Sequence, residues 1–144
     1  MLVGEVMTEG AITASPDTSV HEVASLMRVH NVGSVVLVAV DGRPIGFITD
    51  RDIVLSVVAQ RRSLDDRASE HASSPVIRAE PDMEVEEATL RMVRHGVRRL
   101  VVVSGGAVRG VVTLDDLSSR GLEPELSARV TRAALPAPAA GSRS

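Results

Sequence analysis

Two segments of the chain share a pattern of side chains that could bind a nucleotide: a glycine, two apolar residues, a threonine and, three residues later, an aspartate. They run from Gly46 to Asp52 and from Gly110 to Asp116. The threonine hydroxyl can bond a phosphate or ribose oxygen, and an ionised aspartate can accept hydrogen bonds from two vicinal ribose hydroxyls. Each pattern lies where an apolar run passes into a helical pattern, and the start of a helix favours a phosphate. The glycine is expected to let a ligand approach the backbone closely.

The same spacing also has a structural explanation. Thr49 and Thr113 suit the N-cap of a helix, and Asp52 and Asp116 suit its third position. There they would satisfy free amide groups and contribute about 1 kcal/mol to stability. Both explanations stay open, because duplication copies structural features as readily as binding sites.

An internal repeat contains both patterns. The segment from Ile12 to Val38 aligns without a gap on the segment from Ile77 to Val103, and the identical positions include Pro16, Asp17 and His30. A one-residue deletion in the following turn then brings the two patterns into alignment. The chain is therefore a duplicated unit.

Apolar periodicity predicts the order strand, helix, strand, strand, helix in each copy, and hence an α/β fold. In the first copy we expect strands over 11–14, 34–40 and 45–48, with helices after Ser19 and from Thr49. In the second copy we expect strands over 76–79, 99–103 and 108–112, with helices over 84–95 and from Leu114.

The expected domains are residues 1–60 and 72–121, joined by a linker over 61–71 and followed by a tail over 122–144. A weak amphipathic helix is expected over 122–135, and the Pro- and Ala-rich end of the tail is expected to be disordered. Each half is close to the size at which a core becomes marginal, so the two repeats are expected to pack as one pseudo-symmetric module. The remaining chain is too short for an output domain, so any output is expected to pass through a partner.

Composition argues against several classes of protein. All 16 Lys and Arg positions are arginine, which excludes a lysine Schiff base and a P-loop lysine. Cysteine is absent, which excludes disulfides and thiolate zinc sites. The net charge of −3 argues against a nucleic-acid partner. The longest apolar run, Val35 to Val40, is far shorter than the roughly 20 residues of a membrane helix, so a cytoplasmic location is expected.

Neither a metal site nor a catalytic site is expected. His30 and His95 occupy equivalent helix ends, where a cation complements the helix dipole, and His21 and His71 have no ligand partner at metal-binding spacing. No Ser/His/Asp constellation stands out along the sequence.

The repeat, the Pro-Asp before the first helix of each copy and the paired Thr/Asp patterns resemble the tandem cystathionine-β-synthase (CBS) domain pair, also called a Bateman module. The resemblance covers about residues 3–120, and the segment from Thr49 to Val54 is similar to small stand-alone proteins of this family. It implies a regulatory module without catalytic activity that senses energy state or a metabolite. The expected ligand is AMP, ADP, ATP or S-adenosylmethionine, bound in the cleft between the two copies. The alternative is a structural or interaction protein that dimerises and docks a partner without binding nucleotide.

The resemblance also implies the residues of two sites. Thr49 and Asp52 would hold ribose and phosphate in one site, where the adenine would rest on the other copy at Val76, Ile77 and Val97. Thr113 and Asp116 would do so in the other site, where the adenine would rest on Ile12, Val32 and Ser34. Arg98 and Arg99 would contact phosphates. They occur only in the second copy, since the first has Gly33 and Ser34 there, so the two sites are expected to differ.

A homodimer is expected from the second helix of the first copy. Ile53, Val54, Val57 and Val58 form an apolar stripe there and Leu55 lies outside it, so one sheet cannot cover all of these side chains. Family members commonly pair two modules through such helices.

Overall fold

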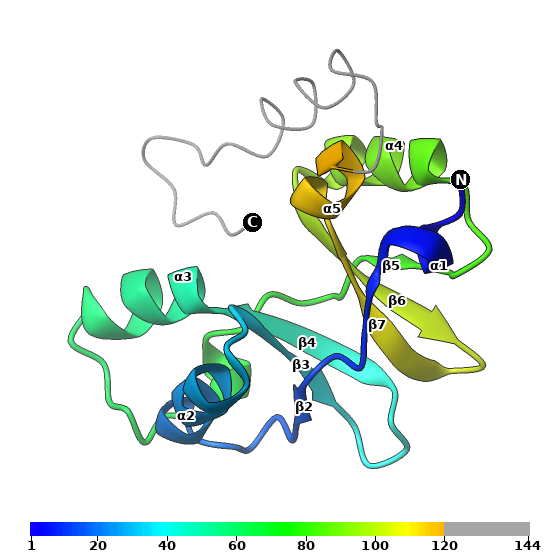
Figure 1. Ribbon diagram of the computed structural model, residues 1–144. Helices are drawn as coiled ribbons and strands as arrows, with labels where there is room; N and C mark the ends of the chain where they lie inside the picture. The colour runs from blue at the N-terminus through cyan, green and yellow to red at the C-terminus, as the bar shows by residue number, and fades with distance from the viewer. Residues whose placement is uncertain (120–144) are drawn as a thin grey trace. The chain divides into compact units, whose positions relative to one another are not determined.

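The computed structural model describes residues 1–119 of the 144-residue chain, which divide into two compact units (Figure 1). The first-repeat unit is Ala11–Val76, and the second-repeat unit combines Met1–Gly10 with the described chain from Ile77 onward. The predicted α/β class is confirmed, as is the order strand, helix, strand, strand, helix in each repeat. The helix expected over 122–135 lies outside the described residues.

The first-repeat unit is built on a three-stranded sheet. Strands β2 (Thr13–Ala14), β3 (Ser34–Val38) and β4 (Pro44–Thr49) lie in the order β2-β3-β4, with β2 parallel and β4 antiparallel to β3. β3 ends two residues earlier than predicted, because its register with β4 shifts between Leu37 and Val38 and a turn follows that bonds the Gly42 amide to the Ala39 carbonyl. Aliphatic side chains from the sheet and helices form the core: Val20, Val23, Met27, Val35, Leu37, Ile48, Ile53, Val57 and Ala68.

Helix α2 (Val20–His30) begins and ends as its sequence predicts. The Ser19 hydroxyl accepts a hydrogen bond from the Glu22 amide at 3.1 Å, and Asn31 ends the helix in the left-handed conformation at φ 53°. Val20, Val23 and Met27 are buried at the expected helical spacing, so this face packs against the sheet.

The second helix of the first repeat changes its winding along its length. Helix α3 (Asp50–Asp52) passes directly into a π-helix, η1 (Ile53–Val58), which the apolar pattern does not predict. Ile53 and Val57 point into the core, while Val54 and Val58 remain more than half exposed. The predicted stripe is therefore divided between the core and the surface.

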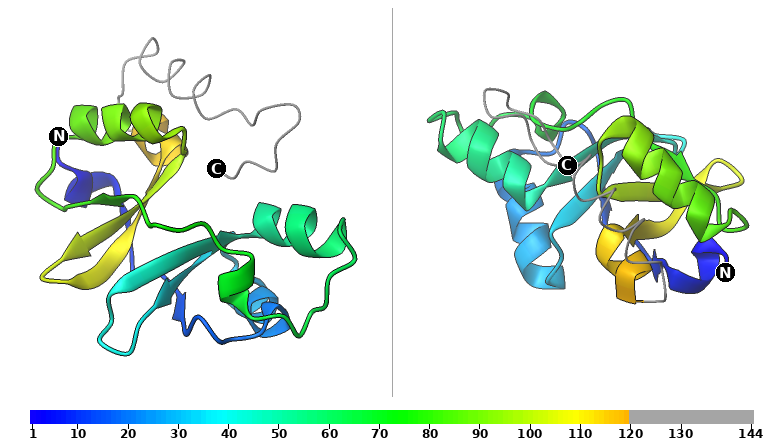
Figure 2. Two further views of the ribbon diagram at one scale, coloured as in Figure 1. Left: turned by 180° about the vertical axis from the view of Figure 1, so that it is seen from behind. Right: turned by 90° about the horizontal axis from the view of Figure 1, so that it is seen from above.

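The second-repeat unit contains a four-stranded sheet in the order β1-β7-β6-β5. Helices α4 (Val85–His95) and α5 (Leu114–Ser119) lie side by side on it (Figure 2). Gly96 ends α4 in the left-handed conformation at φ 63°. The strands are β1 (Thr8–Glu9), β5 (Arg78–Ala79), β6 (Arg99–Ser104) and β7 (Ala107–Thr113).

Each repeat is completed by the segment that precedes the other repeat. Helix α1 (Val3–Val6) and strand β1 belong to the second-repeat unit, and the blue N-terminal segment lies beside the yellow strand β7 in Figure 1. The short 3-10 helix η2 (Ala68–Glu70), which precedes the second repeat, packs in the first-repeat unit. We call residues 1–10 and 67–74 the exchanged segments.

The two exchanged segments make matching hydrogen bonds. The Val3 amide donates to the Met83 carbonyl at 2.8 Å, and the Ala68 amide donates to the Thr18 carbonyl at 2.7 Å. These donors and acceptors are equivalent under the repeat. The N-terminal ammonium also donates to Glu84 Oε2 at 3.3 Å, and this hydrogen bond raises its pKa. The sequence repeat thus extends to segments that the predicted strand and helix order leaves out.

His71 anchors its exchanged segment with polar bonds instead of apolar packing. Its ring is 1% exposed, with Nδ1 2.6 Å from Ser56 Oγ and Nε2 2.9 Å from Asp66 Oδ2. In the neutral imidazole, Nε2–H donates to the carboxylate and Nδ1 accepts from the hydroxyl. The equivalent residue in the second-repeat unit is Val6, which lies in the apolar core. A buried polar group needs such partners, so Ser56 and Asp66 make the histidine tolerable at this position.

Gly110 lies where β1 of the N-terminal exchanged segment pairs with β7 at the edge of the sheet. A Cβ atom at Gly110 would collide with the carbonyl oxygen of Thr8, whereas one at the equivalent Gly46 would lie 3.3 Å from Leu37 Cδ1 and 3.4 Å from Ala72 Cβ. The prediction that Gly110 leaves room for a ligand is therefore wrong, because backbone from β1 fills that space.

We expect Gly110→Ala to lower the free energy of unfolding by about 1–3 kcal/mol, the usual cost of overpacking. Gly46→Ala should cost less, because flexible side-chain atoms can move aside there. Urea unfolding of the two variants beside the parent measures both values. Equal effects, or a stabilised Gly110→Ala, would contradict the tight contact with β1.

Candidate functional site

The first Thr/Asp pair closes a reciprocal helix cap at the junction of β4 and α3. The Thr49 amide donates to Asp52 Oδ2 at 2.9 Å, and the Asp52 amide donates to Thr49 Oγ1 at 3.1 Å. Both residues are 2% exposed. The structural explanation of the pattern is therefore correct for this pair.

The second pair has the same geometry at the junction of β7 and α5. The Thr113 amide donates to Asp116 Oδ2 at 2.8 Å, and the Asp116 amide donates to Thr113 Oγ1 at 3.1 Å. These two residues are half-buried, so their polar atoms are more accessible than those of the first pair.

The amides of the first turn of α3 donate hydrogen bonds to oxygen atoms of the chain itself. The Asp50 amide donates to the Gly33 carbonyl at 2.9 Å, and the Arg51 amide donates to Asp50 Oδ1 at 2.8 Å. The Asp52 amide is bound by Thr49, as described above. The expectation that free helix amides would hold a phosphate is therefore wrong at this motif, because all three are engaged within the chain.

The starts of neighbouring strands lie beside each motif within its own unit. Ser34 is paired with Thr49 across β3 and β4, and Arg99 is paired with Thr113 across β6 and β7. The Arg98 carbonyl accepts from the Leu114 amide at 2.9 Å. The arginine predicted to bind phosphate and a motif threonine are thus strand neighbours in the second repeat.

The other predicted site residues lie at equivalent places in the two repeats. The Ile12 carbonyl accepts from the Val36 amide, and the Ile77 carbonyl accepts from the Val101 amide. The Val32 amide donates to the Met27 carbonyl, and the Val97 amide donates to the Met92 carbonyl. Both carbonyls lie near the end of the preceding helix. Val76 is the last residue of the first-repeat unit. The combination of each Thr/Asp pair with residues of the other repeat stays a prediction.

The two motifs differ in charge at two neighbouring positions that are equivalent in the repeats. Gly33 and Asp50 meet in the first-repeat unit, where a Cβ added to Gly33 would lie 3.2 Å from Asp50 Oδ2. Arg98 and Leu114 occupy the equivalent positions in the second repeat and share the equivalent backbone bond. At these two positions the first repeat thus carries an acidic residue, Asp50, and the second a basic one, Arg98.

The Ser56, His71 and Asp66 cluster is a polar constellation that the sequence pattern missed. Asp66 also lies 3.3 Å from an Arg62 guanidinium nitrogen. The three residues are dispersed along the chain with no motif, and only the alignment of His71 with Val6 could have singled the histidine out. Because the imidazole is buried in the unit's interior, we interpret the cluster as an anchor for the exchanged segment.

Two other kinds of site are absent from residues 1–119. There, no group of three or more His, Asp or Glu side chains is arranged to hold a metal ion. Over the same residues, no helix has the length and apolar character needed to cross a membrane.

Comparison with known proteins places this geometry in a family. A sequence model of the CBS domain matches residues 3–59 and 68–123. YhcV, a CBS domain-containing protein of Bacillus subtilis, is 39% identical over 116 residues, which cover 81% of this chain and 82% of YhcV. MK0525 of Methanopyrus kandleri is 45% identical over 130 residues, and these cover 89% of this chain but 65% of that protein.

Solved structures with the same fold include complexes with adenosine compounds. PAE2072 of Pyrobaculum aerophilum, complexed with AMP, is 30% identical with a TM-score of 0.74, covering 92% of this chain and 99% of that one. The CBS domain pair of MJ0100, in complex with 5′-methylthioadenosine and S-adenosylmethionine, is 28% identical with a TM-score of 0.75, covering 83% and 94%. The chain therefore belongs to the CBS domain family and carries two CBS domains in tandem.

Proposed function

We propose that this chain is a regulatory module, without catalytic activity of its own, that binds an adenosine-containing ligand between its two CBS repeats. The ligand class comprises AMP, ADP, ATP and S-adenosylmethionine. The observation that carries the proposal is the recurrence of one Thr/Asp pair, with the same atoms and nearly the same distances, at the strand-to-helix junction of both repeats. The AMP complex of PAE2072 and the S-adenosylmethionine complex of MJ0100 support the ligand class.

The capping geometry is compatible with ligand binding. In each cap the threonine oxygen accepts an amide hydrogen, so its own hydroxyl proton can be donated to a phosphate or ribose oxygen. Each carboxylate accepts one amide through Oδ2, and a carboxylate is a group that can accept bonds from ribose hydroxyls. The cap thus orients the groups that would recognise the sugar.

The proposed sites combine one motif with apolar residues of the other repeat. One site contains Thr49, Asp52, Val76, Ile77 and Val97, and the other contains Thr113, Asp116, Ile12, Val32 and Ser34. Arg98 and Arg99 are proposed to bind phosphate next to Thr113. The chain has no Trp or Tyr and a single Phe, so adenine would be held between aliphatic side chains.

An interaction protein that binds no nucleotide is the second candidate. The Thr/Asp pairs already serve as helix caps, and the second helix of the first repeat exposes Val54 (54%), Leu55 (40%) and Val58 (61%). We propose that this surface joins two copies of the chain, with or without nucleotide. For the first candidate, the nucleotide-binding regulatory module, we propose a role in energy sensing in the cytoplasm.

Removal of the motif carboxylates tests the ribose contact. We expect Asp52→Ala and Asp116→Ala each to weaken binding at one of two sites by on the order of 1.5–3 kcal/mol, the range for hydrogen bonds to charged groups. Titration calorimetry with AMP, ATP and S-adenosylmethionine measures the loss. Loss of the cap lowers stability by about 1 kcal/mol in either case, so unfolding curves must confirm that both variants are folded.

Asp115→Ala is the matched control, because Asp115 is an exposed neighbour outside the pair. It should bind like the parent. If all three variants bind every nucleotide like the parent, the ribose role is wrong and the interaction candidate is favoured.

The arginines of the second repeat should set a preference for phosphate. Arg99→Ala is expected to reduce the preference for ATP over adenosine by about tenfold, the scale of one hydrogen bond to a charged group, while adenosine still binds. Arg94→Ala, at an exposed position near the end of α4, should leave the preference unchanged. Two identical, independent sites in the parent titration would contradict this assignment.

The mass of the protein in solution tests whether two chains associate. Light scattering should give twice the chain mass of 15.2 kDa for the parent. Val58→Glu should give the mass of one chain, because it places a charge within the exposed apolar surface, and Val40→Glu in the hairpin should remain dimeric. A parent that keeps the mass of one chain as the sample is concentrated would rule the dimer out.

A further inference from the structure

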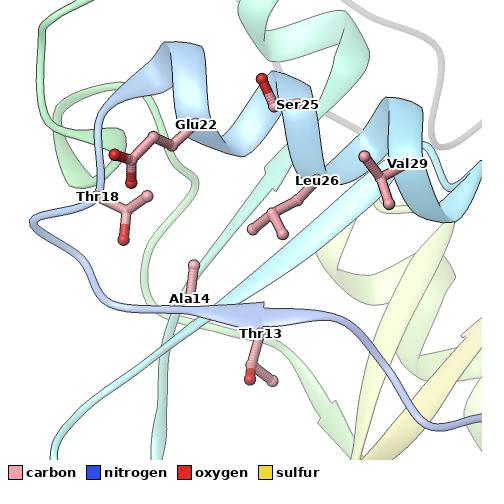
Figure 3. A pocket seen from close by; sticks show the side chains of 7 residues that line it. All are labelled: Thr13, Ala14, Thr18, Glu22, Ser25, Leu26 and Val29. Carbon is pink, nitrogen blue, oxygen red and sulfur yellow. The ribbon is translucent and has the colours of Figure 1, made fainter.

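The first-repeat unit has an open pocket between α2 and the edge strand β2. Its volume is about 460 Å³, within the range of ligand-binding pockets. Figure 3 shows Leu26 and Ala14 on facing elements, with Glu22 and Thr18 near one end. The lining residues are Thr13, Ala14, Thr18, Glu22, Ser25, Leu26 and Val29, and none is among the residues proposed to bind nucleotide.

In the second-repeat unit, an arginine of the same chain occupies the equivalent place. Arg91, the counterpart of Leu26, donates from Nη1 to the Arg78 carbonyl at 2.7 Å. Its Nη2 lies 3.6 Å from Glu87 Oε1, and its Nη1 lies 3.7 Å from Glu80 Oε2. Arg78 and Glu87 are the counterparts of Thr13 and Glu22. The second repeat therefore shows which chemical group these positions can hold.

Smaller side chains open the pocket in the first repeat. Thr18 replaces Met83, which is 7% exposed in the core of its unit, and Leu26 replaces Arg91. At the rim, Ser25 and Val29 replace Leu90 and Arg94. The guanidinium and its stem are thus missing from the first repeat, together with part of the surrounding packing.

Two of the three acceptors remain where the arginine is missing. Thr13 and Arg78 hold the same register in parallel strand pairs, opposite Val36 and Val101. The carbonyls of Ile12 and Ile77 accept bonds from the neighbouring strands. Carbonyls alternate in direction along a strand, so those of Thr13 and Arg78 face the free edge of the sheet. In Figure 3 the Thr13 side chain points away from α2, so Thr13 offers its backbone to the pocket.

Glu22 supplies the second acceptor. Its carboxylate takes part in no ion pair among the residues that the structure describes, whereas its counterpart Glu87 is paired with Arg91. Only the third acceptor has changed, since Ser15 stands in place of Glu80. The pocket therefore keeps a carbonyl and a carboxylate beside the apolar wall formed by Ala14, Leu26 and Val29.

We propose that this pocket binds an arginine side chain presented by an extended segment of a partner protein. A guanidinium matches the two acceptors through its planar set of donors, and its aliphatic stem would pack on Leu26 and Val29. A partner segment fits better than a free amino acid, because the pocket opens along the unpaired edge of β2. Such an edge is where an extended chain can add main-chain hydrogen bonds.

Paired peptides test the chemistry. Binding of the full chain to the blocked peptide Ala-Val-Arg-Val-Ala is compared by calorimetry and NMR with the same peptide carrying citrulline, which has the shape of arginine without its charge. We expect the arginine peptide to bind at least tenfold more tightly, because a charge-assisted bond is lost with citrulline. Equal binding of the two peptides, or binding of neither, would overturn the proposal.

Variants locate the site. Leu26→Arg should abolish binding by filling the pocket as Arg91 does, and Leu90→Arg, which adds the same charge to α4, should not. Glu22→Gln, at an exposed position, should weaken binding tenfold or more and serves as the second variant if Leu26→Arg does not fold. Parent-like binding by a folded Leu26→Arg or by Glu22→Gln would reject this pocket. Agmatine that binds as tightly as the peptide would overturn the partner segment in favour of a small-molecule ligand.

Discussion

The hydrogen bonds of Val3 to Met83 and of Ala68 to Thr18 hold each exchanged segment on a repeat that is distant in sequence. Each bond fixes the residues just before a repeat's first helix, and α1 and η2 then cover part of the core that the sheet and helices leave open. The same segments then continue along the outer edges of β4 and β7, whose other edges pair with β3 and β6. The Thr/Asp caps stand at the ends of β4 and β7. Each motif therefore lies at the end of a strand that has a hairpin partner on one edge and an exchanged segment on the other.

Much of the fold was predictable because it is determined locally. The spacing of Val20, Val23 and Met27, the cap at Ser19 and the β-branched run from Ser34 to Val38 each act over a few residues. The Thr/Asp caps were predictable for the same reason. The exchanged segments were not, since each is short and its partners lie far away along the chain. The repeat symmetry does not indicate on which of the two similar cores an exchanged segment will pack.

The site was predictable only in part. The Thr/Asp residues follow from their pattern, and Arg99 was named from the family resemblance. The engaged amides of α3 depend on Gly33 and Asp50 meeting in three dimensions. The role of Gly110 was misjudged for a related reason. Glycine permits close approach, but the sequence does not say whether a ligand or another strand will approach. His71 was missed because its partners are dispersed along the chain and form no motif.

The exchange of leading segments also bears on how such a chain could arise. A single repeat with its own leading segment could not complete itself in the way seen here, because that segment packs on the other repeat. Two copies of such an ancestor would each have to donate a segment to the other, as in a domain-swapped dimer. Gene duplication and fusion would then convert contacts between two chains into contacts within one. After fusion the two halves could diverge independently, which accounts for a histidine at 71 opposite a valine at 6 and a leucine at 26 opposite an arginine at 91.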